Sequence, residues 1–326
     1  MEEVRTEIID NYLAKNLFGP SPVRRGFFLE EMKMGINGVW LPIITPFSNG
    51  EIDFVSYERL INHYIAMGIS GLIPLGTTGE SPTVKGIEFE RIVEKTVSVV
   101  DHRIPVFIGA GGNYTQKVLE KIKIVERYGV DGILSVCPYY NRPDQKGMYH
   151  HFMRISESTP LKIMIYNIPY RTGVNLRNDT LFRLAEQENI VAVKDSCGDI
   201  IQSLELIFNR PSGFAVMTGE DILFYTGIVN GGEGGVMASA HIETGTFIDV
   251  YNSVLDNDHG TALEAWRRIQ SIIPLLFEEP NPTPIKYLLH RLEMIPSQET
   301  RLPLTEISDG LKNKLNDFIK KLDPPL

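Results

Sequence analysis

Eight short runs of apolar residues recur along the chain from Gly38 onward, and they constrain the fold more than any other feature. Each run is too short for a helix and too continuously apolar for a half-exposed strand, so each predicts a strand buried on both faces. Between the runs, apolar residues recur with the 3.6-residue period of amphipathic helices. The predicted strands are 39–44, 71–75, 105–108, 132–136, 162–166, 190–193, 214–217 and 234–237.

The spacing of these runs predicts a particular architecture. Successive strands start about 25 to 35 residues apart, which is the length of one βα unit. About eight such units predict an α/β fold, a (β/α)₈ TIM barrel with additional C-terminal helices. A doubly wound sheet is the competing topology, but no G-x-G-x-x-G motif opens a helix after the first strand. We expect an N-terminal extension of unknown role over 1–37, the barrel over 38–245, and helices over 246–326 packed on the barrel or on a partner subunit.

Composition excludes several classes of protein. Lysine and arginine number 32 against 41 acidic residues, and this net charge of −9 argues against binding to nucleic acid or to an anionic membrane. No apolar stretch approaches the ~18 residues of a membrane span, and the acidic N-terminus does not resemble a signal peptide. The two cysteines are too few for a disulfide framework and favour a reducing compartment. We therefore expect a cytoplasmic protein.

The residues at the carboxyl ends of the predicted strands suggest chemistry, because active sites of such barrels lie there. Lys194 follows the apolar run 190–193. Burial disfavours an ammonium ion, lowers the pKa of the amine and makes it a nucleophile that can form a Schiff base with a carbonyl carbon. The alternative interpretation is a lysine that reaches to water at the strand rim or pairs with Asp195.

Two loops could hold carboxylates. Gly76, Thr77 and Thr78 offer hydroxyls and backbone N–H groups on a turn where glycine permits close approach of a ligand. The alternative is an ordinary helix N-terminus with a threonine cap. Arg171 follows another strand and could bind a second carboxylate bidentately, or it could form a surface ion pair.

Tyr140 and Tyr166 also follow predicted strands. Their phenols could relay protons, although a tyrosine at a barrel rim often serves packing alone. The seven histidines lack the spacing of metal ligands, and neither cysteine has a catalytic histidine beside it. We therefore expect a reaction that needs no metal and no cofactor.

These motifs resemble the dihydrodipicolinate synthase family, within the N-acetylneuraminate lyase superfamily of class I aldolases. The resemblance extends from about Gly38 to the C-terminus, and several long motifs occur in the family's order and spacing. The segments that carry it are 76–81, 138–143, 166–173, Lys194, 279–286 and 301–305.

The resemblance implies roles for individual residues. Lys194 forms a Schiff base with pyruvate, and Tyr166 passes protons through Thr77 to Tyr140, which in this family reaches in from a neighbouring subunit. The residues that the resemblance places around the substrates are Thr77 and Thr78 at the pyruvate carboxylate, Arg171 at the carboxylate of the second substrate, Gly76 and Val236. A homo-oligomer, a dimer of dimers, is implied as well.

The activity implied is a lyase reaction of lysine biosynthesis, in which pyruvate and L-aspartate 4-semialdehyde condense to 4-hydroxy-tetrahydrodipicolinate. Asp195 and Ser196 depart from the family's usual Glu-Ala pair after the lysine. They are closer to superfamily members that act on a hydroxy-oxoglutarate or a keto-deoxy sugar acid, so another pyruvate-dependent aldolase or a 2-oxo acid dehydratase is the alternative. A catalytically silent barrel is disfavoured because every catalytic position is filled.

The resemblance also leads to an expectation about regulation. Lysine-sensitive members carry an acidic group at the position of Lys117, and Phe89 replaces a polar residue at the same site. A lysine side chain there repels the amine of a lysine ligand. We therefore predict that free lysine does not inhibit this protein.

Overall fold

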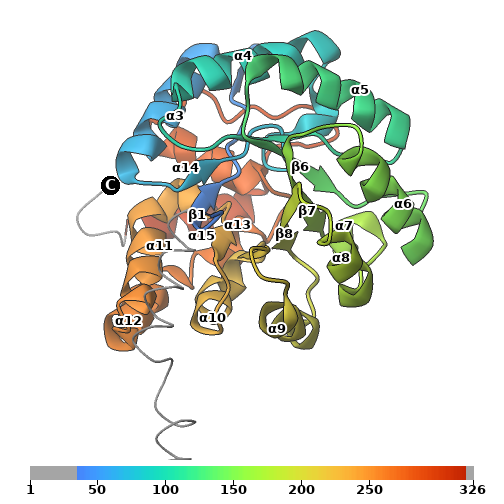
Figure 1. Ribbon diagram of the computed structural model, residues 1–326. Coiled ribbons are helices and arrows are strands. Elements are labelled where there is room, and N and C mark those ends of the chain that lie inside the picture. The colour runs from blue at the N-terminus through green and yellow to red at the C-terminus, as the bar shows by residue number, and fades with distance from the viewer. Residues whose placement is uncertain (1–34, 321–326) are drawn as a thin grey trace, which may run out of the picture. The chain divides into compact units, whose positions relative to one another are not determined.

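The computed structural model describes residues 35–320 and contains alternating strands and helices (Figure 1). The strands are β1 (Gly38–Leu41), β2 (Phe47–Ser48), β3 (Glu51–Ile52), β4 (Gly71–Leu72), β5 (Phe107–Gly109), β6 (Gly132–Val136), β7 (Lys162–Asn167), β8 (Ile190–Asp195), β9 (Ala215–Thr218) and β10 (Gly234–Val236). The α-helices are α3 (Phe54–Met67), α4 (Gly86–Val100), α5 (Thr115–Val125), α6 (Gln145–Ser156), α7 (Pro169–Thr172), α8 (Asn178–Leu184), α9 (Ile200–Asn209), α10 (Phe224–Val229), α11 (Ala240–Leu255), α12 (His259–Ile269), α13 (Ile273–Leu276), α14 (Thr283–Arg291) and α15 (Asp309–Ile319).

Eight parallel strands form one sheet in the order β4-β1-β10-β9-β8-β7-β6-β5. A parallel bridge between Leu72 and Val106 joins the two outermost strands and closes the barrel. Helices surround the strands (Figure 1), which explains why the strands are buried on both faces. The predicted (β/α)₈ TIM barrel with additional C-terminal helices is thus confirmed.

Each of the eight predicted apolar runs coincides with a barrel strand, with differences only at the ends. The first run was predicted to reach residue 44 and the second to reach 75, but β1 ends at Leu41 and β4 at Leu72. Pro42 and Pro74 follow closely, and proline has no N–H to continue the ladder. The residues beyond, such as Ile43 and Ile44, are nevertheless fully buried.

The first long helix shows how the sequence fixes the outer layer. The carboxylate of Asp53 accepts hydrogen bonds from the N–H groups of Val55 and Ser56 at the start of α3. Gly68 ends the helix at φ 93°, a conformation that glycine adopts without strain. Between these caps, Tyr57, Leu60, Ile61 and Tyr64 recur with helical spacing and form the buried face of α3.

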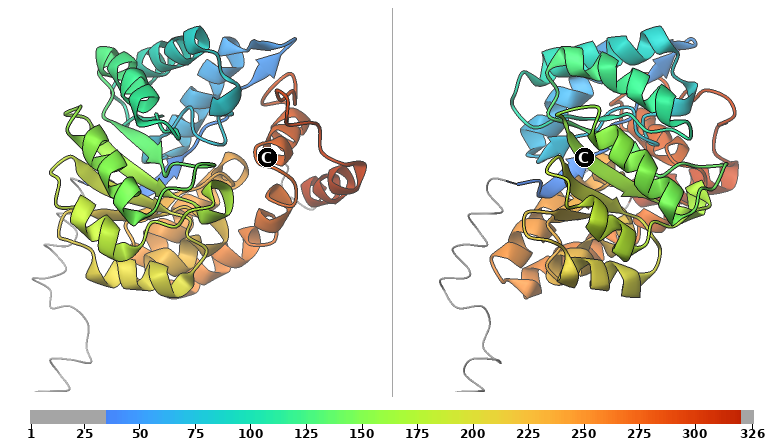
Figure 2. Two further views of the ribbon diagram at one scale, coloured as in Figure 1. Left: turned by 90° about the vertical axis from the view of Figure 1, so that its right-hand side faces the viewer. Right: turned by 45° about the vertical axis from the view of Figure 1, so that its right-hand side comes forward.

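The residues from Asn37 onward form one compact unit. The helices near the C-terminus lie together at one side of the barrel (Figure 2). Helix α11 runs across the predicted boundary at residues 245 and 246, and all but the last three residues of the predicted extension 1–37 lie outside the described residues. Within residues 35–320, no helix combines the length and apolar character needed to cross a bilayer.

Candidate active site

Lys194 lies near the carboxyl end of β8 and is 7% exposed. Its Cα partner on β7 is Tyr166, and the ammonium nitrogen lies 4.3 Å from the centre of the tyrosine ring. Burial lowers the pKa of Lys194 to about 8, although the negative charges of Asp221 and Glu220 oppose the shift. About a tenth of the amine is therefore uncharged at pH 7, far more than for an exposed lysine, and able to attack a carbonyl carbon.

Tyr166 is almost completely buried beside this amine. Burial raises the pKa of its phenol well above the ordinary value, while the positive charge of Arg171 opposes the rise. The phenol therefore keeps its proton at neutral pH, and it can donate that proton to an oxygen bound next to Lys194.

The loop after β4 brings two hydroxyls to the same place. Thr78 is 3% exposed, and its Oγ1 accepts a hydrogen bond of 2.9 Å from the side-chain amide of Asn281. Gly79 makes the tight turn possible, because a Cβ there would lie 2.9 Å from the backbone nitrogen of Leu75. Nothing lies within 4 Å of the Cβ position of Gly76, which leaves open space for a ligand.

Arg171 supplies a cation at the edge of the site. It belongs to the short helix α7, and its guanidinium carbon lies 5.4 Å from the ring centre of Tyr170. Among the described residues no carboxylate lies within ion-pair distance of it. The surface ion pair that the sequence left open is not formed, so the guanidinium is available to an anionic ligand.

Two adjoining cavities connect these groups. A small one of about 20 Å³ is lined by Lys194 and Asp221, and a larger one of about 350 Å³ extends toward Tyr139 and Lys121. Both cavities are lined by the same central residues: Gly76, Thr77, Leu134, Tyr166, Arg171 and Asn281. The structure thus brings residues from β6, β7 and β8 and from the loops after β4, β6, β7 and β9 to one site with Asn281 of the C-terminal segment.

Two residues expected at the site lie apart from it in the single chain. Tyr140 is 89% exposed at φ 71°, and of the two adjacent tyrosines only Tyr139 lines the larger cavity. Val236 is fully buried on β10, opposite Trp40, and lines neither cavity in the part of the chain that the structure describes. The roles assigned to Tyr140 and Val236 stay predictions.

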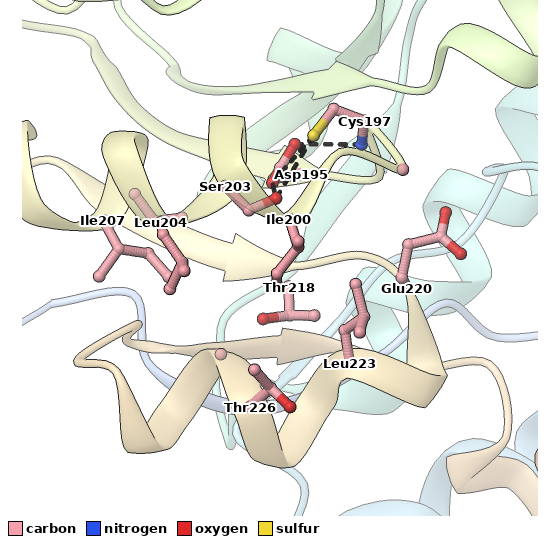
Figure 3. A pocket seen from close by; sticks show the side chains of 13 residues that line it. Asp195, Cys197, Ile200, Ser203, Leu204, Ile207, Thr218, Glu220, Leu223 and Thr226 are labelled. Atoms are coloured by element: carbon pink, nitrogen blue, oxygen red, sulfur yellow. Dashed lines mark hydrogen bonds between the residues drawn. The ribbon is translucent and has the colours of Figure 1, made fainter.

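Asp195 does not pair with Lys194. Successive side chains on a strand point to opposite faces, and the carboxylate of Asp195 faces α9 (Figure 3), where Ser203 Oγ donates to it at 2.5 Å and the Cys197 N–H at 3.1 Å. A separate cavity of about 20 Å³ lies there, lined by Thr218 and Glu220 among others. This geometry removes the alternative in which Lys194 is merely a partner of Asp195.

Two acidic side chains beside Lys194 were not predicted to take part in the site. Asp221 is 4% exposed, accepts a 2.6 Å hydrogen bond from the Ser239 N–H, and has its pKa raised by burial to about 6. Burial and the neighbouring charge of Asp221 raise the pKa of Glu220 to about 7. Their position directly after a barrel strand is the sequence signal that could have identified them.

Comparisons with known proteins show which family the chain belongs to. Residues 35–322 match the model of the dihydrodipicolinate synthetase family. The chain belongs to this family. A relative from Clostridium acetobutylicum, named 4-hydroxy-tetrahydrodipicolinate synthase 2, is 54% identical over 88% of this chain and 100% of its own length.

Solved structures of the family are similar too. The crystal structure of dihydrodipicolinate synthase from Aquifex aeolicus has a TM-score of 0.86 and 35% identity, and the match covers 89% of this chain and 99% of that one. The chloride-inhibited dihydrodipicolinate synthase from Acinetobacter baumannii, solved with pyruvate, has a TM-score of 0.85 and 34% identity over 87% and 98% of the two chains. The predicted family, and with it the predicted barrel, is thus confirmed.

Proposed function

We propose that this chain condenses pyruvate with L-aspartate 4-semialdehyde to give 4-hydroxy-tetrahydrodipicolinate, a step of lysine biosynthesis. The observation that carries the proposal is the buried amine of Lys194, 4.3 Å from the Tyr166 ring, in a cavity that it shares with the cation of Arg171. The family match and the names of the relatives support the same activity.

The reaction begins with the pyruvate ketone. Lys194 Nζ adds to the ketone carbon, Tyr166 donates a proton to the departing oxygen, and water leaves as the imine forms. The imine makes the methyl protons acidic, and transfer of one of them to the Tyr166 phenolate, which gave up its proton in the previous step, leaves an enamine and restores the phenol. The hydroxyls of Thr77 and Thr78 and the loop N–H groups hold the pyruvate carboxylate throughout.

The second substrate then enters from the larger cavity. Arg171 binds its carboxylate, and the enamine carbon attacks the aldehyde carbon, whose oxygen takes up a proton. The substrate's own amine finally attacks the imine carbon and displaces Lys194 as the ring closes. The side chains named in these steps all line one or both of the two cavities.

We further propose that the protein acts as a homo-oligomer, with a dimer of dimers as the expected form, in the cytoplasm. The exposed phenol of Tyr140 lies outside the cavities of its own chain, which supports a role in the site of a second copy. Cys137 and Cys197 are free thiols, in keeping with a reducing compartment.

Borohydride trapping tests the imine. After incubation with pyruvate and reduction, the mass adduct should map to Lys194, and Lys194→Ala should lose both adduct and turnover. Lys162→Ala, which alters an exposed lysine on the neighbouring strand, is the matched control and should keep both. Absence of any adduct on the wild-type protein would reject the Schiff-base chemistry.

A coupled assay tests the second substrate. Turnover with aspartate semialdehyde should exceed that with 4-hydroxy-2-oxoglutarate or a 2-keto-3-deoxy sugar acid. Preference for either of the latter would replace the proposed activity with that of another pyruvate-dependent aldolase or dehydratase.

A further inference from the structure

We propose that the C-terminal segment 281–301 acts as a clamp that holds the loop 76–81 in the shape that binds pyruvate, with Asn281 and Lys286 as positioning residues. This inference rests on the proposed function, because it concerns how the carboxylate of that substrate is bound. From the sequence, this segment was expected only to pack on the barrel or on a partner subunit.

The first element of the clamp is a buried ion pair. The side chains of Lys286 on α14 and Glu80 in the loop are both 0% exposed, and their charged atoms lie 2.5 Å apart. The ammonium of Lys286 also donates to the carbonyl of Glu299 at 2.8 Å, and the second oxygen of Glu80 accepts from the N–H of Arg301 at 3.0 Å. Two points of the segment, Lys286 and Arg301, are thereby attached to Glu80.

A buried ion pair contributes little net stability compared with a well-packed apolar pair, because both ions lose their hydration. Its hydrogen bonds do, however, fix geometry. Glu80 has φ 51°, and its N–H donates to the carbonyl of Thr77 at 3.0 Å. Holding the Glu80 carboxylate therefore also fixes the turn that presents Thr77 to the cavity.

The second element acts directly on a ligand-binding hydroxyl. The side-chain amide of Asn281 donates to Thr78 Oγ1 across 203 residues of sequence, and Asn281 itself lines both cavities. Because the Thr78 oxygen accepts this bond, its own proton remains to be donated, and among residues 35–320 it donates to no other group. Asn281 thus orients the Thr78 hydroxyl as a donor toward an anion.

The test separates binding from chemistry by trapping the imine with borohydride over a range of pyruvate concentrations, without the second substrate. Asn281→Ala should raise the half-saturating pyruvate concentration about tenfold, the factor expected for one hydrogen bond to a charged group. The maximal trapped fraction should be unchanged. Asn281→Asp should raise the half-saturating pyruvate concentration further than Asn281→Ala does, because the new carboxylate accepts the Thr78 proton and repels pyruvate.

The ion pair is tested without leaving a charge unpaired. The double variant Glu80→Gln with Lys286→Met should also raise the half-saturating pyruvate concentration at unchanged maximal trapping. Arg210→Met is the control, because it breaks the largely buried Arg210–Glu233 pair at the opposite ends of the strands. It should lower the melting temperature and leave the pyruvate dependence as in the wild type.

The outcomes distinguish failure of the clamp from failure of the proposed function. If wild-type protein gives no adduct, the proposed function fails. If wild-type protein is trapped and Asn281→Ala and the double variant show the wild-type pyruvate dependence, the clamp is wrong and the proposed function stands. An effect of Arg210→Met equal to that of Asn281→Ala would also overturn the clamp, since the effect would then reflect stability alone.

Discussion

Gly219 lies against Lys194 so closely that a Cβ at Gly219 would be 2.9 Å from Lys194 Cε. The same Cβ would be 2.2 Å from Ser196 Oγ, a fully buried hydroxyl next to the site. The lysine therefore occupies space that exists only because residue 219 has no side chain. This relationship makes Gly219 a steric determinant of the position of the Lys194 amine.

Substitution of Gly219 by alanine should displace Lys194. We expect turnover to fall at least about a hundredfold, the scale of a 1 Å misplacement of a reacting group, and the free energy of unfolding to fall by about 1–3 kcal/mol from overpacking. Steady-state assay and denaturant titration measure the two effects. Gly86→Ala is the matched control, since nothing lies within 4 Å of its Cβ position; normal turnover of Gly219→Ala would contradict the steric role.

The pH dependence of imine formation should follow the pKa of Lys194. Burial lowers this pKa to about 8, so below pH 8 the uncharged fraction, and with it the rate of pyruvate imine formation, should fall about tenfold per pH unit. The rate should level off above pH 8. Quenching the reaction with borohydride after short times, at a series of pH values, measures the rate of imine formation.

Substitution of Asp221 tests whether that pH profile reports the titration of Lys194, because it should shift the profile in a known direction. Its negative charge, together with that of Glu220, raises the pKa of Lys194, whereas Arg171 lowers it. Asp221→Asn removes one negative charge, so the pKa of Lys194 should fall and the acidic limb should move to lower pH. A limb that stays in place or moves to higher pH would show that the titrating group is not Lys194 under the influence of Asp221.

The parts of the molecule that were predictable from sequence are those that depend on local pattern. A strand that is buried on both faces requires a continuous run of apolar residues, so the barrel strands could be located from the sequence, although not their exact ends. Lys194 could be identified for a related reason, because a charged residue at the end of an apolar run is unusual. Even its separation from Asp195 follows from the alternation of side chains along β8.

The parts that could not be predicted depend on contacts between distant residues. Asn281 meets Thr78 across 203 residues and Lys286 meets Glu80 across 206, and no local pattern encodes either contact. The close approach of Gly219 to Lys194 is of the same kind, because it arises from the packing of two neighbouring strands. The position of Tyr140 relative to a second copy cannot be predicted from the sequence pattern of one chain.

Tyr140→Phe should reduce turnover by about a hundredfold or more, the usual contribution of a positioned acid or base. Imine trapping with pyruvate should persist, because Lys194 and Tyr166 are untouched. A steady-state assay and borohydride trapping, run side by side, measure the two. Unchanged turnover would show that the exposed phenol takes no part in the reaction.

Mixing two inactive variants tests whether Tyr140 acts in the site of a second copy. In a mixed oligomer of Tyr140→Phe and Lys194→Ala chains, the site of the first chain keeps Lys194 and receives an intact Tyr140 from its partner. Activity should therefore reappear on mixing after reversible dissociation. If Tyr140 serves its own chain, every site lacks one group and no activity returns.

Free lysine should not inhibit the protein. The larger cavity carries the ammonium of Lys121, which lies 6.0 Å from the ring centre of Phe89, and burial together with the nearby charge of Lys117 lowers the pKa of Lys121. Two like charges disfavour binding of a third amine at this place. Initial rates should be the same without lysine and with lysine up to millimolar concentration, with sodium chloride as the ionic-strength control; a saturable inhibition curve specific to lysine would contradict the prediction.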